Sequence, residues 1–170
     1  MAAHKHILEE ESPVFANLFE KARENGIEIR SILISAKSAS GTAIRDILGY
    51  VYTKKIELKG VVKAQKLMFV AEKYGLGKLV TTCQTFIRNN MNNDDALELL
   101  AAAHDSKLIS AGLLKEFVLA YMMEHRKEFA SNNRFLDMMT KRPELLTPLF
   151  LRLVSPAKRL NKVLASLKKN

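Results

Sequence analysis

Few side chains in this sequence have both the type and the spacing that catalysis or metal binding requires. Four histidines are present, at positions 4, 6, 104 and 125. His4 and His6 are two residues apart, so on a helix they would point in different directions. No cysteine and histidine residues have the spacing of a zinc site. The sequence therefore predicts no metal site.

Three further features could carry chemistry, and each has a simpler structural interpretation. Cys83 lies on the apolar stripe of a predicted helix, which favours a buried structural thiol over a nucleophile. The acidic run Glu9–Glu11 fits a solvated helical turn. The segment Gly75–Gly77 lacks the strand, the glycine loop and the lysine-serine ending of a phosphate-binding loop. We therefore expect no catalytic residue, no cofactor and no small-molecule substrate, and we do not expect an enzyme.

The composition is that of a folded chain. The 170 residues are 48% hydrophobic, which excludes a disordered protein, and they include a single cysteine, Cys83. No apolar run approaches the roughly 20 residues of a membrane span, so a membrane partner is not expected. The first residues lack the layout of a signal peptide. Together with the absence of an internal disulfide, this predicts an intracellular protein.

Much of the formal net charge of +9 comes from the last 20 residues, which hold six basic side chains and no acidic one. Within this tail, Lys158, Arg159 and Lys162 predict a nuclear localisation signal, and hence a nuclear protein that also occurs in the cytoplasm. The alternative is an amphipathic helix that touches an acidic partner or a membrane surface. Nucleic-acid binding is less favoured, because the sequence has no tryptophan and only 7% aromatic residues for base stacking.

Helical periodicity dominates the chain. Ser12 followed by Pro13 predicts a helix start, with serine as the N-cap and proline at the first helical position. Gly75 predicts a left-handed helix end, and Asn93 is the expected cap of a later helix that has Asp94–Asp95 in its first turn. Apolar stripes along these helices should form the core, beginning with Val14, Phe15, Leu18 and Phe19, then Ile44, Ile47, Leu48 and Val51, and then Ala64, Leu67, Met68 and Ala71.

Two short stretches alternate between apolar and polar residues, as strands do. They are residues 27–30, which residues 32–34 can extend, and residues 55–58. A sheet of two strands is marginal alone, because its outer backbone groups need partners. Either helices cover a very small sheet, or the strands that complete it lie outside this chain.

A series of motifs in residues 2–90 resembles the BTB/POZ domain family. The first is the sequence Ala3–Leu8, which precedes Ser12–Phe15 and Leu18–Glu20. The later motifs follow in the family's order and are Ile27–Ile29, Ile47–Thr53, Val70–Leu76 and Leu79–Phe86, the last with a cysteine at its usual place. The wording of Ser12–Phe15, the helical pair after residue 90 and the basic segment Pro156–Leu160 are most similar to the speckle-type POZ proteins.

The resemblance implies a mainly helical α+β fold, with a small sheet flanked by helices. Residues 1–90 would be a partial BTB/POZ domain, residues 91–150 a helical extension of the kind that follows it, and residues 151–170 a basic tail. Only Met1 and Ala2 precede the first motif, whereas the family begins with two strands. The resemblance therefore implies an N-terminally truncated member.

Members of this family join other proteins, so the resemblance implies an adaptor of a cullin-3 ubiquitin ligase. Its partners would be cullin-3 and a second BTB protein, identical or different. By motif position, Ile7 would lie on the dimer face. The cullin-binding loop would contain Ala22, Arg23 and Glu24, the nearest match to the family's apolar-x-Glu motif. Two alternatives stay open, namely a BTB oligomerisation module that does not recruit the ligase and a helical, basic nucleic-acid-binding protein.

Overall fold

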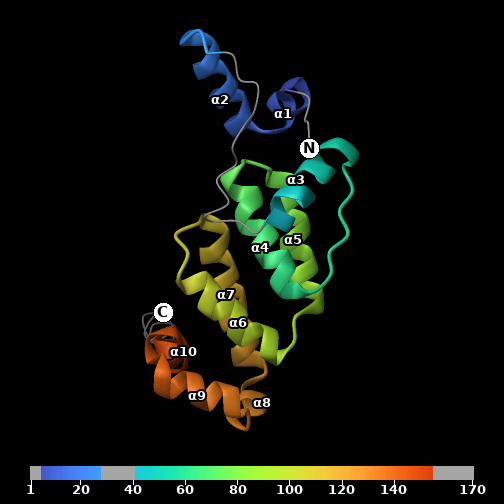
Figure 1. The fold of residues 1–170 in the computed structure, drawn as a ribbon. Helices are drawn as coiled ribbons and strands as arrows, with labels where there is room; N and C mark the ends of the chain where they lie inside the picture. Colours follow the sequence, from blue (N-terminus) through green and yellow to red (C-terminus); the bar gives the residue numbers. More distant parts are fainter. Residues whose placement is uncertain (1–4, 28–40, 155–170) are drawn as a thin grey trace, which may run out of the picture. The chain divides into compact units, whose positions relative to one another are not determined.

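The computed structural model describes residues 5–27 and 41–154, and in these ranges every regular element is a helix (Figure 1). The chain forms two compact units. The first contains residues 1–91 and 107–111, and the second contains residues 92–106 and 112–170. Within the described residues, no helix is both long and apolar enough to cross a lipid bilayer.

In the described residues, the first unit contains five helices and the beginning of a later one. The five are α1 (Lys5–Glu11), α2 (Pro13–Glu24), α3 (Gly41–Thr53), α4 (Val61–Lys73) and α5 (Gly77–Asn90). Helices α4 and α5 lie side by side, α3 packs on α4, and α1 packs on both α2 and α3 (Figure 1).

Ser12 separates α1 from α2 and starts the second helix as the sequence predicts. Its backbone is extended, with φ −136° and ψ 114°, and its side-chain oxygen accepts a hydrogen bond from the Phe15 backbone N–H at 3.2 Å. Pro13 occupies the first helical position, where the missing N–H is not needed. The N-cap prediction is therefore confirmed.

The α4–α5 pair contributes many of the buried side chains of the first unit. The predicted stripe Ala64, Leu67, Met68 and Ala71 is buried, and so are Leu79, Cys83 and Ile87 on α5. Gly75, between the two helices, has φ +70°, as its predicted role as a left-handed helix end requires. The Leu76 N–H bonds back to the Ala71 carbonyl at 2.9 Å, which closes the turn.

The apolar stripe predicted for α2 is only half buried. Phe15 and Phe19 are 1% and 3% exposed, but Val14 and Leu18 are each 40% exposed. The four side chains form two adjacent columns on the helix, and the described neighbours of α2 cover only the column of Phe15 and Phe19. The placement of Val14 and Leu18 in the core was therefore wrong.

The predicted strand at residues 55–58 is also wrong. Residues 54–60 join α3 to α4 without regular structure, and Lys54 turns the chain with φ 56°. Alternating apolar and polar residues suit a strand, but a strand forms only where a second chain segment supplies the ladder of hydrogen bonds. No other described segment pairs with residues 55–58. The small sheet is therefore not seen in the described residues. The strand predicted over residues 27–30, with its extension at 32–34, lies outside them except for Ile27, which is not in a strand.

The second unit is also helical. It contains α6 (Asn93–His104), most of α7 (Ile109–Glu124), α8 (Arg126–Ala130), α9 (Asn133–Lys141) and α10 (Pro143–Val154). The largest fully buried side chains of these helices are Leu97, Leu99, Leu100, Leu119, Met122, Phe129 and Leu145. Asn92, rather than the predicted Asn93, caps α6, because its side-chain oxygen accepts from the Asp95 N–H at 2.9 Å. Asp94 and Asp95 lie in the first turn, as predicted.

Helix α7 begins with a cap that comes from α4. The Glu72 carboxylate accepts hydrogen bonds from the backbone N–H groups of Ile109 at 2.9 Å and Ser110 at 3.0 Å. The first N–H groups of a helix lack partners within the helix, and this carboxylate satisfies two of them. Its negative charge also interacts favourably with the positive end of the helix dipole. Residues 107–111 are held in the first unit in this way.

Replacement of Gly75 should destabilise the first unit more than its backbone angle alone explains. A Cβ atom at this position would lie 2.8 Å from Pro13 Cγ. We expect Gly75→Ala to lower the free energy of unfolding by about 2–3 kcal/mol, from the left-handed backbone and from the overlap with proline. Urea unfolding followed by circular dichroism measures the loss.

Gly26→Ala is the matched control. Gly26 also has a positive φ of 66°, but a Cβ there meets no described atom within 4 Å. It should cost only about 1 kcal/mol, the backbone part of the effect. Equal losses in the two variants would show that the contact with Pro13 contributes nothing.

Candidate protein-binding site

The α1–α2 hairpin is fixed to the turn between α4 and α5. The Ser12 hydroxyl, which is 0% exposed, donates a hydrogen bond to the Tyr74 carbonyl. The rings of Phe15 and Tyr74 stack with their centroids 5.0 Å apart, and Pro13 lies beside Gly75. A partly buried hydrogen bond, a ring contact and the close approach of Pro13 to Gly75 therefore set where the hairpin presents its outer side chains.

Ile7 is half buried on α1, next to the fully packed Leu8, which is 3% exposed. Nearby, the Lys5 ammonium lies over the Phe19 ring, 5.0 Å from its centroid. The structure thus places part of the Ile7 side chain at the surface, where a second protein can contact it. The role of Ile7 at a dimer face stays a prediction.

Val14 and Leu18 add exposed apolar surface to the same hairpin. They are one helical turn apart on α2, so their side chains are neighbours. Apolar residues at this spacing usually indicate core, so the sequence alone does not mark Val14 and Leu18 as part of a binding surface. The signal that could have identified them is the width of the stripe, since Phe15 and Phe19 already supply the buried side.

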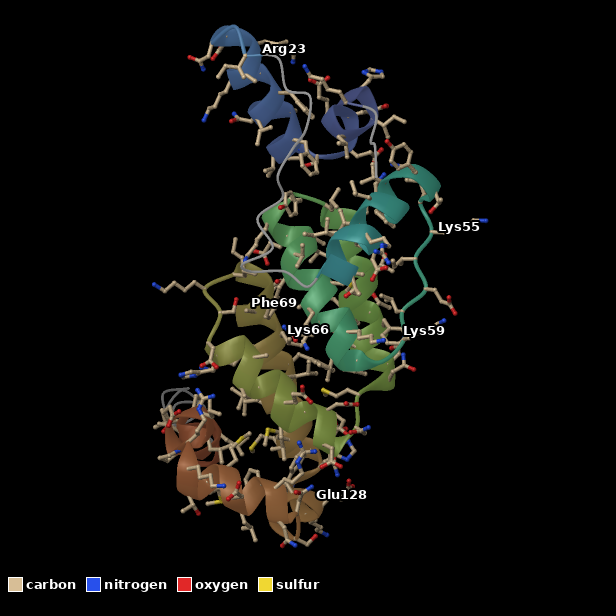
Figure 2. All side chains as sticks on the ribbon, viewed as in Figure 1. Arg23, Lys55, Lys59, Lys66, Phe69 and Glu128 are labelled. Carbon is tan, nitrogen blue, oxygen red and sulfur yellow. The ribbon has the colours of Figure 1, made fainter. Side chains whose placement is uncertain are left out.

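The segment proposed as a cullin-binding loop is the last turn of α2. Ala22 is buried, at 9% exposed, whereas Arg23 and Glu24 are exposed. Figure 2 labels Arg23, whose guanidinium contacts the Glu9 carboxylate at 3.1 Å. The helix ends after Glu24, and the Ile27 N–H bonds to the Ala22 carbonyl at 2.8 Å. The structure therefore brings Arg23 and Glu24 to the surface but not Ala22.

Polar side chains in the second unit join the ends of three helices. The Asn93 side chain donates to Glu128 at 2.7 Å and accepts from the Tyr121 hydroxyl at 3.1 Å. His125 lies 3.2 Å from the other Glu128 oxygen and stacks on Tyr121. Hydrogen bonds from Asn93 and His125 lower the pKa of the Glu128 carboxyl, which Figure 2 labels. The polar side chains of Asn93, Tyr121, His125 and Glu128 all have partners within this cluster, so its role is to hold the helix ends together.

Cys83, the nucleophile considered in the sequence, lies in the packed interior on α5. Cys83 is 0% exposed, and burial raises the pKa of its thiol to about 12, which suppresses the reactive thiolate. This confirms the interpretation of Cys83 as a buried thiol. In the part of the chain that the structure describes, no three metal-ligating side chains cluster. The basic residues Lys158, Arg159 and Lys162 lie outside the described residues.

The sequence model of the BTB/POZ domain matches residues 1–91, which include the α1–α2 hairpin and helices α3 to α5. This match rests on the sequence.

Individual relatives are similar over most of this chain. A BTB/POZ domain-containing protein of Arabidopsis thaliana is 26% identical over 148 residues, which cover 87% of this chain and 58% of the relative. TD and POZ domain-containing protein 4 of Mus musculus is 27% identical over 158 residues, 90% of this chain and 40% of the relative. Protein maternal effect lethal 26 of Caenorhabditis elegans is 25% identical over 148 residues, which cover 87% of this chain and 36% of the relative. The match therefore spans between about a third and three fifths of these relatives.

The burial of Cys83 predicts slow chemical modification. At pH 8 we expect iodoacetamide to alkylate the folded chain about a hundredfold or more slowly than the same chain in guanidinium chloride, because little thiolate forms and reagent cannot reach it. Mass spectrometry of timed samples measures both rates. Similar rates would contradict the buried thiol. Because the folded pKa is raised, this thiol's contribution to stability is complete below its ordinary pKa of 9.0 and declines as the pH rises above it.

Proposed function

The chain belongs to the BTB/POZ family, and on that premise we propose that it is a protein-interaction adaptor that pairs with a BTB protein and recruits cullin-3. Membership of the family supports a role in protein–protein interaction and association with itself or other BTB proteins. The observation that carries the proposal is the family match over residues 1–91. Such an adaptor contributes effective concentration, since it holds a substrate and the ubiquitin-transferring machinery in one assembly.

The α1–α2 hairpin supports pairing with a second BTB protein. It exposes Val14 and Leu18 and leaves Ile7 half buried, so a partner would remove apolar surface from water. The hairpin is also joined to the α4–α5 turn by the hydrogen bond from Ser12 to the Tyr74 carbonyl. An interface of this kind needs little reorganisation on binding, which favours affinity.

Recruitment of cullin-3 is supported by one part of the candidate motif and opposed by another. Arg23 and Glu24 are exposed and charged, and they suit a polar partner surface. Ala22 is 9% exposed, so the apolar residue of the motif is not free to contact a partner. This burial favours the second candidate function, a BTB oligomerisation module that pairs without recruiting the ligase.

The finer relationship to the speckle-type POZ proteins and the nuclear localisation are part of the same proposal. Both rest on sequence motifs, the latter on Lys158, Arg159 and Lys162.

A fluorescent fusion of the full chain in which Lys158, Arg159 and Lys162 are changed to alanine should shift from the nucleus to the cytoplasm.

Pairing through the hairpin can be tested with Ile7→Asp. A carboxylate in a desolvated interface is costly, so we expect self-association to weaken by about tenfold or more. Analytical ultracentrifugation measures the association, and circular dichroism checks that the helices persist. The control is Leu113→Asp, which places the same charge at an apolar residue of α7 that is 60% exposed. Unchanged association in the Ile7 variant would exclude this face.

Cullin recruitment can be tested by capture on the immobilised N-terminal region of cullin-3. We expect the chain to bind, and Glu24→Arg to weaken capture by about tenfold, because it reverses an exposed charge of the contact surface. Glu98→Arg, the same charge reversal at an exposed glutamate of α6, is the control and should leave capture within about twofold.

Two other results would replace the proposal. Mixed dimers with a complete BTB protein, without cullin capture, would support the oligomerisation module. Binding to duplex DNA that weakens steeply with added salt would support the nucleic-acid-binding alternative.

A further inference from the structure

A pocket separate from the α1–α2 hairpin lies between α3, the irregular segment 54–60 and α4. Its volume is about 530 Å³, within the range of sites that bind small ligands or side chains. Its apolar lining comes from all three parts and consists of Ala43, Ile56, Leu58 and Leu67. Ala43 and Leu67 are 6% and 3% exposed, so they belong to the packed interior, while Ile56 and Leu58 are half buried.

The charged lining of the pocket is mostly lysine. Lys59, Lys63 and Lys66 line it together with two carboxylates, Asp46 and Glu57. Glu57 forms an ion pair with Lys59, with 3.2 Å between the carboxylate oxygen and the ammonium nitrogen. Figure 2 shows Lys59 on the irregular segment and Lys66 on α4.

Lys63 and Lys66 are the cations available to a ligand. They are three residues apart on α4, which makes their side chains neighbours on one helix face. Both are exposed, and among the described residues neither forms an ion pair. Two neighbouring ammonium groups beside an apolar floor suit a ligand that carries negative charge next to an apolar group.

We propose that this pocket docks a short acidic segment of a partner protein. An apolar side chain of that segment enters between Ile56, Leu58 and Leu67, and carboxylates that flank it bond to Lys63 and Lys66. Charge-assisted hydrogen bonds between ammonium and carboxylate are stronger than neutral ones. The burial of the apolar side chain adds the hydrophobic contribution. This inference does not depend on the proposed pairing or on cullin recruitment, because the pocket shares no residue with the hairpin.

The chemistry of the lining favours an acidic peptide over nucleic acid. The pocket has no aromatic side chain on which a base could stack and no arginine for a bidentate contact to phosphate. Asp46 would also repel a continuous phosphate backbone, whereas a short peptide can place its carboxylates on the lysine side only.

The test uses the full chain and a fluorescein-labelled peptide in which glutamates flank two leucines, with binding followed by fluorescence anisotropy. We expect Lys63→Glu and Lys66→Glu each to weaken binding by about tenfold, since each replaces an attraction by a repulsion. Lys78→Glu, an exposed lysine on α5, makes the same change in net charge away from the pocket and should leave binding within about twofold. Asp46→Asn should tighten binding.

A second peptide and a second measurement localise the interaction. Replacement of the two leucines by serines should also weaken binding by about tenfold, and amide chemical shifts in the folded chain should change within residues 42–67. An equal loss in Lys78→Glu, equal binding of the serine peptide, displacement of the peptide by inorganic phosphate or duplex DNA at matched ionic strength, or shift changes confined to other residues would each overturn the proposal.

Discussion

The Ser12 hydroxyl is the contact on which the arrangement of the first unit depends. It accepts from the Phe15 N–H and donates to the Tyr74 carbonyl, so one buried atom both starts α2 and attaches that helix to the α4–α5 turn. Removal of this oxygen would leave two backbone groups without partners at a position that is 0% exposed, and such groups are costly to bury. The apolar and charged side chains that the hairpin presents are placed by this connection.

Sequence signals predicted the fold best where the cause is local. Ser12 and Pro13 define the start of α2 by their own backbone preferences, and Gly75 ends a helix because only glycine takes a φ of +70° without strain. Asn93 was wrong by one residue, since two asparagines in sequence are both competent caps and the extended backbone at Asn92 decides between them. The strand at residues 55–58 failed for the opposite reason, because alternation is local but a ladder requires a distant partner.

The candidate binding site could be predicted only in part. The resemblance located Ile7 and the segment from Ala22 to Glu24, but it could not show that α2 continues through that segment and turns Ala22 inward. Exposure of Val14 and Leu18 depends on which helices pack on α2, which periodicity does not specify. The lysine-lined pocket escaped prediction because Ala43, Ile56 and Leu67 come together only when α3, α4 and the segment between them are packed.

Because Glu72 caps α7, the first compact unit extends further along the chain than the family match does. The family match ends at residue 91, yet residues 107–111 belong to the same compact unit. Two of their backbone N–H groups donate hydrogen bonds to the Glu72 carboxylate. A recombinant fragment cut at the edge of the alignment would leave this carboxylate without its helix and would remove Ala111, which is 0% exposed, from its packing. The shortest piece that preserves all of these contacts therefore extends beyond the recognisable domain into α7.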